Sequence, residues 1–358
     1  MQSLFLAQIA LYNFRNYKQS QFEFHRGLNF LIGPNGAGKT NLMEAIAYLA
    51  YGRSFRYQQD RELINFNHTH FYLQGKLYRQ GQWIELSLSY RPGNKELRIN
   101  HAPQRLLNLL GTMPAVTFVP DDLYLVKGPP VVRRRFLDRQ ISQVDRSYCY
   151  TLLTYRRVLR QRNLLLRQIK AGRNKGEELD PWDLQLVAMG VPLVKKRREV
   201  LTRWSSVAGE YYEILASGQA KMSLIYQPSL KDEEDWLRAL SRNREKEIAA
   251  GTTLWGPHRD DFAFQIQGRA GRHFASQGEQ RSLVLALKIA EVVYFTEVLR
   301  FTPLLLLDDV FSELDARRQR ALLNLVKDKG QIFISTTDSS LLPGEMVHTG
   351  AVIQLTPP

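Results

Sequence analysis

The apolar positions of the first 120 residues come in short runs that turn residues interrupt, a pattern typical of strands. Residues 28–32 are an apolar run of strand length, and it ends at a glycine. Between residues 69 and 100 apolar and polar residues alternate, and turn sequences such as Gln80-Gly81 divide the alternation. This part of the chain therefore predicts an antiparallel meander. One helical pattern stands among these strands, over residues 41–50, with Gly52 as its stop.

Long helical patterns replace the strands from about residue 123 to residue 215. A loop over 172–181 separates two helical blocks, which predicts a helical hairpin. After about residue 220, strand and helix patterns alternate again, with helical spacing over 283–298 and short apolar runs at 304–307 and 332–335. Strands that alternate with helices indicate an α/β sheet. The pattern divides the chain into the segments 1–122, 123–220 and 221–358.

The composition narrows the choice of partners. The 358 residues give room for about two domains, and no apolar run approaches the ~20 residues that cross a bilayer. With 49 Lys and Arg against 35 Asp and Glu, the net charge is +14. Such a charge is compatible with plain solubility, but it also points to an anionic partner, nucleic acid before membrane. The single cysteine, Cys149, cannot form an internal disulfide, which suits a reducing, cytoplasmic compartment.

The positive charge is concentrated in the helical middle of the chain. Residues 151–203 contain 13 Lys or Arg and 5 Asp or Glu, a net charge of +8. A charge run is usually a solvated helix face, whereas concentration in one segment favours a surface that contacts nucleic-acid phosphates. The candidate DNA-binding residues are Arg156, Arg157, Lys195, Lys196, Arg197 and Arg198.

The segment from Gly33 to Thr40 matches the pattern G-x-x-x-x-G-K-[ST]. It follows an apolar strand and opens a helix, as a phosphate-binding loop requires; the alternative is a glycine-rich turn before an ordinary helix. Glycines let the backbone wrap a phosphate, Lys39 would reach the β and γ phosphates of ATP, and the Thr40 hydroxyl would bind Mg²⁺. The candidate nucleotide-binding residues are Gly33, Pro34, Asn35, Gly36, Ala37, Gly38, Lys39, Thr40 and Asn41.

A second acidic site follows the apolar run at 304–307. Asp308 and Asp309 would stand at the tip of a buried strand, where Asp308 would hold Mg²⁺, directly or through water. Asp309 would then orient or deprotonate the water that attacks the γ phosphate, so it joins Lys39 as a candidate catalytic residue. Two acids that cap a following helix are the alternative, and Ser312 to Asp315 is itself a capping pattern.

The segment 276–281 reads S-Q-G-E-Q-R and precedes a helical pattern. Alone it is a weak match to S-x-G-x-Q, but it lies about 30 residues before the acidic strand and far from the phosphate loop. In this arrangement the chain resembles the ABC-type ATPase superfamily. The resemblance implies that this segment is the signature motif, whose Ser276, Gly278 and Gln280 face the γ phosphate bound by a second copy. It also implies that Ser312 to Asp315 is the D-loop.

Further strings narrow the resemblance to the RecF family of recombination proteins. They are N-F-R-N-Y at 13–17, G-R-S-F-R at 52–56, P-D-D-L at 120–123, V-K-G at 126–128, R-R-R-F-L-D at 133–138, L-D-P-W-D at 179–183 and G-P-H-R-D-D at 256–261. The matches extend over nearly the whole chain, from residue 11 to about residue 338. Together and in this order they are far more specific than any one of them.

The RecF resemblance implies an ATP-dependent DNA-binding protein of recombinational gap repair, which helps to load recombinase on gaps with RecO and RecR. It implies an α/β ABC-type ATPase head similar to SMC heads. Lobe I, with mixed sheets, would comprise 1–122 and 221–358, and the smaller, mainly helical lobe II would comprise 123–220. The resemblance implies further that ATP drives a homodimer that clamps double-stranded or junction DNA. Slow, DNA-stimulated ATP hydrolysis would then release it.

The sequence departs from the wider superfamily at three places. Asp309 stands where a Glu is usual, and the shorter carboxylate predicts slow hydrolysis. The superfamily often has a Gln in the stretch that joins the lobes, but no Gln occurs in 118–122. We consider Asp121 or Asp122 as the residue that replaces it. The switch His of transporters is absent, and Thr336 or Thr337 stands in its place. A hydroxyl can still bond a phosphate oxygen, so Thr336 is the third candidate catalytic residue.

Other interpretations stay open at the level of the sequence. A transporter ATPase subunit would share the nucleotide motifs, but it usually carries the Gln and the His that are absent here. A metabolic phosphotransferase with Asp309 as base would leave the signature and the basic segment unexplained. Arg15 either neutralises a phosphate or lies on a strand surface. His258 is either functional or, as is more common in a turn, structural.

Overall fold

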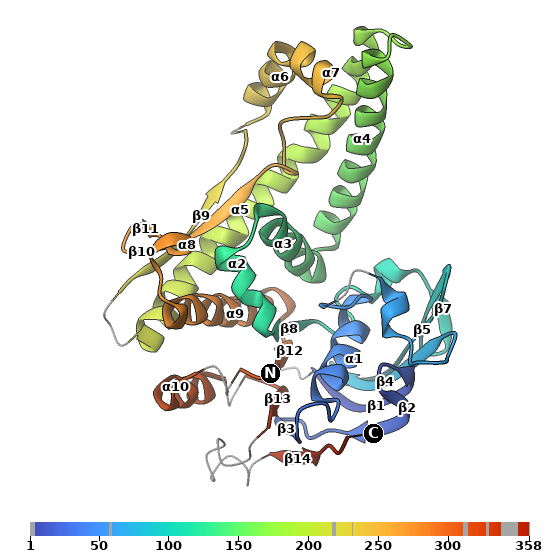
Figure 1. The fold of residues 1–358 in the computed structure, drawn as a ribbon, viewed down its shortest axis with the longest axis vertical. Helices are drawn as coiled ribbons and strands as arrows, with labels where there is room; N and C mark the ends of the chain where they lie inside the picture. Colours follow the sequence, from blue (N-terminus) through green and yellow to red (C-terminus); the bar gives the residue numbers. More distant parts are fainter. Residues whose placement is uncertain are drawn as a thin grey trace. The chain divides into compact units, whose positions relative to one another are not determined.

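The computed structural model describes residues 4–56, 59–216, 220–230, 232–310, 314–326, 329–337 and 350–357. The chain forms two compact units, which we describe separately (Figure 1). Unit 1 comprises Met1–Asp122, Glu210–Gln219 and Gln277–Pro358, and unit 2 comprises Leu123–Gly209 and Ala220–Ser276. Residues 220–276 thus group with the helical middle of the chain. The lobe boundaries expected at 122 and 220 stay a prediction.

Unit 1 contains the antiparallel meander that the alternation of apolar and polar residues predicts. The described strands lie in the order β2-β1-β4-β5-β6-β7, and all neighbours are antiparallel. Tight turns at Gly81 and Gly93, with φ of 88° and 84°, join β4 to β5 and β5 to β6. The strands are β1 (Leu4–Phe14), β2 (Tyr17–Glu23), β4 (Phe71–Arg79), β5 (Gln82–Arg91), β6 (Asn94–Ile99) and β7 (Ala102–Gln104).

The second sheet of unit 1 is parallel, in the order β14-β3-β13-β12-β8. Its described strands are β3 (Leu28–Ile32), β8 (Ala115–Phe118), β12 (Leu304–Leu307), β13 (Ile332–Thr336) and β14 (Ala351–Gln354). All residues of β3, β8, β12 and β13 are buried, as is usual for strands covered on both faces. The predicted α/β class is confirmed. Because the strands are parallel, β3 and β12 present the segment 33–40 and Asp308 at the same edge of the sheet.

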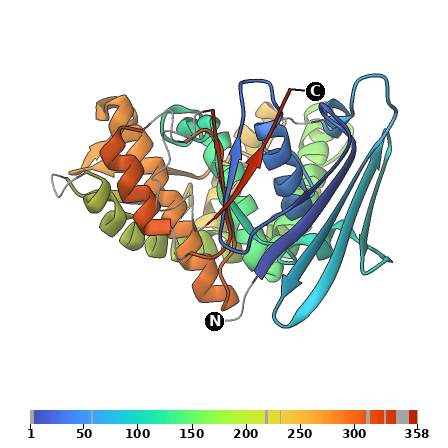
Figure 2. The same cartoon turned by 90° about the horizontal axis from the view of Figure 1, so that it is seen from below.

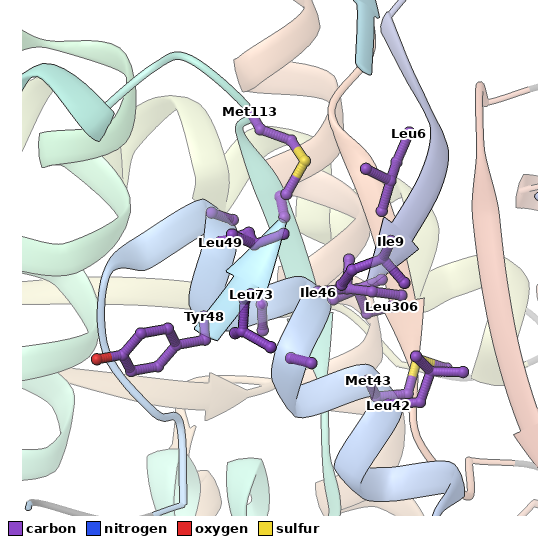
Figure 3. Packing of buried hydrophobic residues seen from close by; sticks show 14 of the residues in the cluster. Leu6, Ile9, Leu42, Met43, Ile46, Tyr48, Leu49, Leu73, Met113 and Leu306 are labelled. Carbon is purple, nitrogen blue, oxygen red and sulfur yellow. The ribbon is translucent and has the colours of Figure 1, made fainter. Parts of the chain in front are cut away.

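Helix α1 (Lys39–Tyr51) lies between the two sheets of unit 1 (Figure 2). Apart from Thr40 and Asn41, every residue of the helix is buried, because both of its sides face a sheet. The helix ends at Gly52, whose φ of 68° and bond to the Tyr48 carbonyl match the predicted stop. Its side chains pack against residues of both sheets, including Leu6, Ile9, Leu73 and Leu306 (Figure 3).

The remaining helical segments of unit 1 lie beside both sheets. They are α9 (Gln277–Leu299), α10 (Ala316–Val326), the end of α5 (Asp180–Ala216), and the short turns η1 (Asp60–Leu63), η2 (Leu106–Leu109) and η3 (Pro120–Leu123). Helix α9 contacts β8, η1 contacts β5 and η2 contacts β6. At the end of β8, the buried carboxylate of Asp122 accepts a bond from the Val119 N–H at 2.9 Å and lies 3.3 Å from Lys288 Nζ of α9. Asp121 is exposed. Asp122 therefore ties the 118–122 stretch to α9.

Unit 2 contains the predicted helical hairpin, formed by α4 (Arg146–Lys170) and α5 (Figure 1). Its other helices and turns are α2 (Tyr124–Lys127), α3 (Pro130–Val144), η4 (Gly176–Leu179), α6 (Glu233–Arg242), α7 (Arg244–Ala250) and α8 (Gly271–Phe274). Unit 2 also has an antiparallel sheet, β11-β10-β9, made of β9 (Met222–Gln227), β10 (Asp261–Ile266) and β11 (Arg269–Ala270). The sequence patterns predict no such sheet beside the helices.

Buried ion pairs hold the helices of unit 2 together. Arg162 of α4 is wholly buried and pairs with Asp183 of α5 at 2.6 Å and with Glu247 of α7 at 2.7 Å. Trp204 is also buried, and its ring packs on Phe136 with centroids 5.9 Å apart. Since an unpaired charge in such a core is costly, these pairs fix the relative positions of the helices. In the parts of the chain that are described, no helix is long and apolar enough to cross a membrane.

Candidate nucleotide site

The loop between β3 and α1 has the backbone of an anion cradle. Gly36 and Gly38 have φ of 82° and 97°, a left-handed conformation that favours glycine. At Gly38 a Cβ would lie 2.6 Å from the hydroxyl oxygen of Tyr17 and 2.7 Å from Nδ2 of Asn16, so that position also lacks the space for a side chain. The Tyr17 hydroxyl donates to the Gly38 carbonyl at 3.1 Å. Tyr17 and Asn16 therefore pack against the end of the loop, at the N-terminus of α1.

This loop borders a cavity of about 270 Å³ at the edge of the parallel sheet. The lining residues are Asn35, Gly36, Gly38, Lys39, Thr40, Asn41, Arg56, Asp309 and Ser335. Most of the residues predicted from the loop motif thus meet Asp309 in one place. The remaining loop residues support the cradle: Gly33 and Pro34 contribute carbonyls, and Ala37 is buried.

Lys39 is folded back onto its own loop. Its Nζ donates to the carbonyl oxygens of Gly33 at 2.6 Å and Pro34 at 2.9 Å. Burial lowers the pKa of Lys39, and the negative charges of Asp309 and Asp308 raise it in part. Phosphate oxygens that enter the cavity would replace these two carbonyls as acceptors and would supply the negative charge that the ammonium group favours.

Asp308, directly after β12, and Thr40, at the start of α1, bring two side-chain oxygens together that could bind a metal ion. The Thr40 hydroxyl donates to Asp308 Oδ1 at 3.1 Å, and the Ser335 hydroxyl donates to the same oxygen at 2.7 Å. Burial raises the pKa of Asp308, while these two hydrogen bonds and the nearby Arg56 lower it and the charge of Asp309 raises it further. A carboxylate beside a hydroxyl fits Mg²⁺, which prefers hard oxygen ligands.

Asp309 has a left-handed backbone with φ of 53°, and its N–H donates to the Ser335 hydroxyl oxygen at 2.8 Å. Ser335 thus bonds to both aspartates. Our expectation for the adjacent Thr336 is not met, because Thr336 is buried in β13 and does not border the cavity. Side chains alternate along a strand, so the residue one position earlier faces the nucleotide site.

Two cationic residues differ from the sequence expectations. Arg56 lines the cavity, although the motifs single it out only as part of a family string. No motif with a fixed spacing could have identified Arg56, because it lies beyond the end of α1 and only the folded chain brings it to the cavity. Arg15, in contrast, pairs with Glu44 at 2.8 Å and donates to the Glu62 carbonyl at 2.7 Å. Its side chain therefore joins α1 to η1.

The signature segment lies at the start of α9. Ser276 is exposed directly before the helix, and Gly278 and Gln280 are partly exposed in its first turn. Among the described residues of unit 1, the cavity wall includes neither Gly278 nor Gln280. Ser312 lies outside the described residues, and Asp315 caps α10 by accepting from the Arg318 N–H at 2.9 Å.

The predicted DNA-binding residues fall into two groups. Arg157, Lys195 and Arg198 are exposed. Arg156 is half exposed and pairs with Asp138 at 2.9 Å, and Lys196 lies 3.5 Å from Asp145 and 3.1 Å from Glu199.

Arg197 is a correction to the predicted DNA-binding set. It is 2% exposed, pairs with Asp138 at 2.7 Å and donates to the Pro257 carbonyl at 2.7 Å. A guanidinium enclosed in this way binds its own fold and is not available to a DNA phosphate.

His258 is structural in this fold. Its Nε2 donates to the Thr253 carbonyl at 3.1 Å, so its Nδ1 accepts from the Tyr155 hydroxyl at 2.7 Å. Burial lowers the pKa of His258 to about 4, and nearby arginines lower it further. The neutral ring therefore joins the 256–261 loop to α4.

These features define a class of protein. A parallel sheet joins a phosphate loop to a distant acidic strand end, and a separate helix carries the signature pattern: this is the architecture of an ABC-type ATPase head. The family model described as "RecF/RecN/SMC N terminal domain" matches residues 5–352. A solved Smc head domain from Pyrococcus furiosus, bound to part of ScpA, has a TM-score of 0.58 at 16% identity over 99% of this chain and 94% of that chain. At that identity it shows the fold alone.

Comparison with individual proteins shows which family of this class the chain resembles. The DNA replication and repair protein RecF of Moorella thermoacetica is 49% identical over 355 residues, which cover 99% of this chain and 96% of the relative. The RecF of Lactobacillus johnsonii is 39% identical, with 98% and 97% covered. A solved structure described as the recombination mediator protein RecF with ATP in the RecFOR pathway has a TM-score of 0.92 at 31% identity, over 99% of this chain and 96% of that chain. The chain belongs to the RecF family, and nothing in these comparisons supports a transporter subunit.

Proposed function

We propose that this protein is an ATP-dependent DNA-binding ATPase of DNA replication and repair, which acts in recombinational gap repair. Its relatives are named DNA replication and repair proteins, and the RecF structure described with ATP belongs to the RecFOR pathway. RecO and RecR are accordingly the proposed partners in loading recombinase on gaps. The cytoplasm is the proposed location.

ATP would bind in the cavity bordered by the loop from Gly33 to Thr40. Lys39 would exchange its two carbonyl acceptors for phosphate oxygens, and the backbone N–H groups at the start of α1 would surround the phosphates. Thr40 and Asp308 would hold Mg²⁺, which neutralises developing charge on the phosphates when bound. The wall of the cavity offers hydroxyl, carboxylate and ammonium groups for these tasks.

Hydrolysis would use Asp309 as the proton acceptor. The carboxylate would take a proton from the attacking water as its oxygen bonds to the γ phosphorus and the bond to the β phosphate oxygen breaks. Ser335 holds the backbone of Asp309 in place at the cavity, so the point from which the carboxylate extends is set before substrate arrives. Because aspartate reaches one methylene less far than the usual glutamate, we expect slow turnover.

A second copy of the chain would complete the site. The observation that carries this proposal is the separation of the signature from the cavity: in the described part of unit 1, Gly278 and Gln280 are partly exposed and do not line it. Ser276 is exposed too. A helix start that carries a serine and a glycine fits an anion, and the anion available to it would be the γ phosphate held by the partner. ATP would then favour the dimer over ADP.

DNA would contact the basic surface of unit 2. We restrict the proposed contacts to Arg156, Arg157, Lys195, Lys196 and Arg198, and leave out the buried Arg197. Contacts to phosphates carry no base information, so binding would be weakly selective for sequence and strongly dependent on salt.

A gel-shift assay with duplex DNA tests the proposal. We expect a shifted complex with ATP, a weaker one with ADP, and loss of the ATP effect in Lys39→Ala. Lys18→Ala is the matched control, since Lys18 is exposed on β2 and contributes nothing to the cavity. If the protein binds no DNA with any nucleotide, the proposed function is wrong.

A further inference from the structure

Three helices of unit 1 meet around the signature motif. Gly278 lies in the first turn of α9, Arg318 lies in the first turn of α10, and Tyr212 lies near the end of α5. Asp315, the residue before α10, completes the group. Together these four residues form what we call the signature cluster.

The guanidinium of Arg318 covers Gly278. A Cβ built on this glycine would lie 3.1 Å from Nη1, 3.6 Å from Nη2 and 3.7 Å from Cζ of Arg318, so several atoms of the planar group lie close to the same backbone position. Any side chain at 278 would displace the arginine or be crowded by it. A side chain at this position would therefore require the end of Arg318 to shift by a few tenths of an ångström, apart from any contact with a nucleotide.

The same guanidinium also pairs with Asp315. Arg318 Nη1 donates to Asp315 Oδ2 at 2.9 Å, and the Arg318 N–H donates to Asp315 Oδ1 at 2.9 Å. The hydrogen bonds and positive charges of Arg318 and Arg317 lower the pKa of Asp315, so the carboxylate stays ionised at neutral pH. Because the carboxylate bonds both ends of Arg318, the arginine has one preferred direction, toward α9.

The end of α5 forms the third wall of the signature cluster. Tyr212 is fully buried, and burial raises its pKa to about 12. The charge of Glu279 raises the pKa further and that of Arg318 lowers it, so both charged groups lie within electrostatic range of the buried hydroxyl. The helix that ends here is the same continuous helix that carries Lys195 and Arg198.

We propose that Arg318 is a positioning residue that holds the first turn of α9 in the orientation needed to meet the nucleotide of a second copy. This inference rests on the proposed ATP-dependent dimer.

Three variants test the role of Arg318. Arg318→Gln removes the charged, planar guanidinium but keeps most of the length of the side chain. Arg318→Lys keeps the charge that pairs with Asp315. Arg320→Gln is the matched control, because Arg320 is exposed on the same helix and its Nε donates to the Ala316 carbonyl at 3.3 Å, within its own helix. Urea unfolding of all three should be alike if the effect is local.

Hydrogen exchange in the absence of nucleotide gives the first readout, and it does not depend on dimerisation. For the amides of residues 281–283, we expect exchange about fivefold or more faster in Arg318→Gln, less in Arg318→Lys, and unchanged in Arg320→Gln. If exchange in Arg318→Gln equals that of the wild type, the inference is wrong whatever the protein does with ATP.

Sedimentation with ATP gives the second readout. We expect Arg318→Gln to bind ATP as a monomer within about twofold of the wild-type affinity, since it does not border the cavity, but to need about tenfold more protein to dimerise. Dimerisation at the wild-type concentration would overturn the inference while leaving the proposed function intact. A wild type that stays monomeric with ATP would overturn the proposed function, and the exchange result would still decide whether Arg318 holds α9.

Discussion

One serine organises both acidic residues of the nucleotide site. The Ser335 hydroxyl donates to Asp308 Oδ1 and accepts from the Asp309 N–H, so it fixes the proposed Mg²⁺ ligand and the proposed base together. The phosphate-loop motif G-x-x-x-x-G-K-[ST] identifies Lys39 and Thr40 from the sequence, because their predicted roles depend on local backbone geometry. Ser335 carries no such motif, and only the register of β13 distinguishes it from Thr336.

Replacement of Ser335 should impair turnover more than replacement of Thr336. We expect Ser335→Ala to lower the rate of ATP hydrolysis about 10- to 100-fold, as is typical when the partner of a metal ligand is removed. Thr336→Val, which keeps the shape of a buried side chain on the other face of the strand, should stay close to the wild type. Phosphate release at saturating ATP and Mg²⁺ measures both. Equal rates in the two variants would contradict the assignment of Ser335.

At the scale of elements, the sequence predicts helices and strands that depend on local patterns better than it predicts the pairing of distant strands. The run at 28–32, the alternation between 69 and 100 and the helical hairpin are all present as expected, because each depends on neighbours in sequence. The sheet of β9, β10 and β11 is not foreseen, because β9 and β10 are separated by about 33 residues that contain two helices. Arg197 is also unforeseen, since a basic run does not reveal which of its members turns inward.

The 256–261 loop makes the stability of unit 2 sensitive to acid. The pKa of His258 is lowered to about 4 in the fold, whereas an unfolded histidine has a pKa of about 6.5. Between these values the unfolded chain binds more protons, so stability falls as the pH falls through this window. His258→Gln should therefore lose less stability than the wild type between pH 7 and pH 5, by roughly 2 kcal/mol. Urea unfolding at the two pH values measures this, and equal losses would argue against a neutral buried ring.

At the scale of the whole molecule, we expect the net charge of +14 to act on DNA through a few exposed side chains of the proposed surface. Lys195→Gln combined with Arg198→Gln should weaken duplex binding about tenfold and reduce the slope of log affinity against log salt by about 2. Lys18→Gln, an exposed change on β2, serves as the control. Anisotropy titrations at several salt concentrations provide the slopes. An unchanged slope in the double variant would place the DNA on a different surface.

The central claim is that the signature motif of one copy completes the nucleotide site in which another copy holds ATP. Sedimentation velocity of the protein with ATP, ADP and a slowly hydrolysed ATP analogue, for the wild type and Ser276→Arg, tests it most directly. We predict dimers of the wild type with ATP and the analogue, monomers with ADP, and monomers of Ser276→Arg that still bind ATP. A wild type that stays monomeric with the analogue, or a Ser276→Arg variant that dimerises as readily as the wild type, would contradict the account.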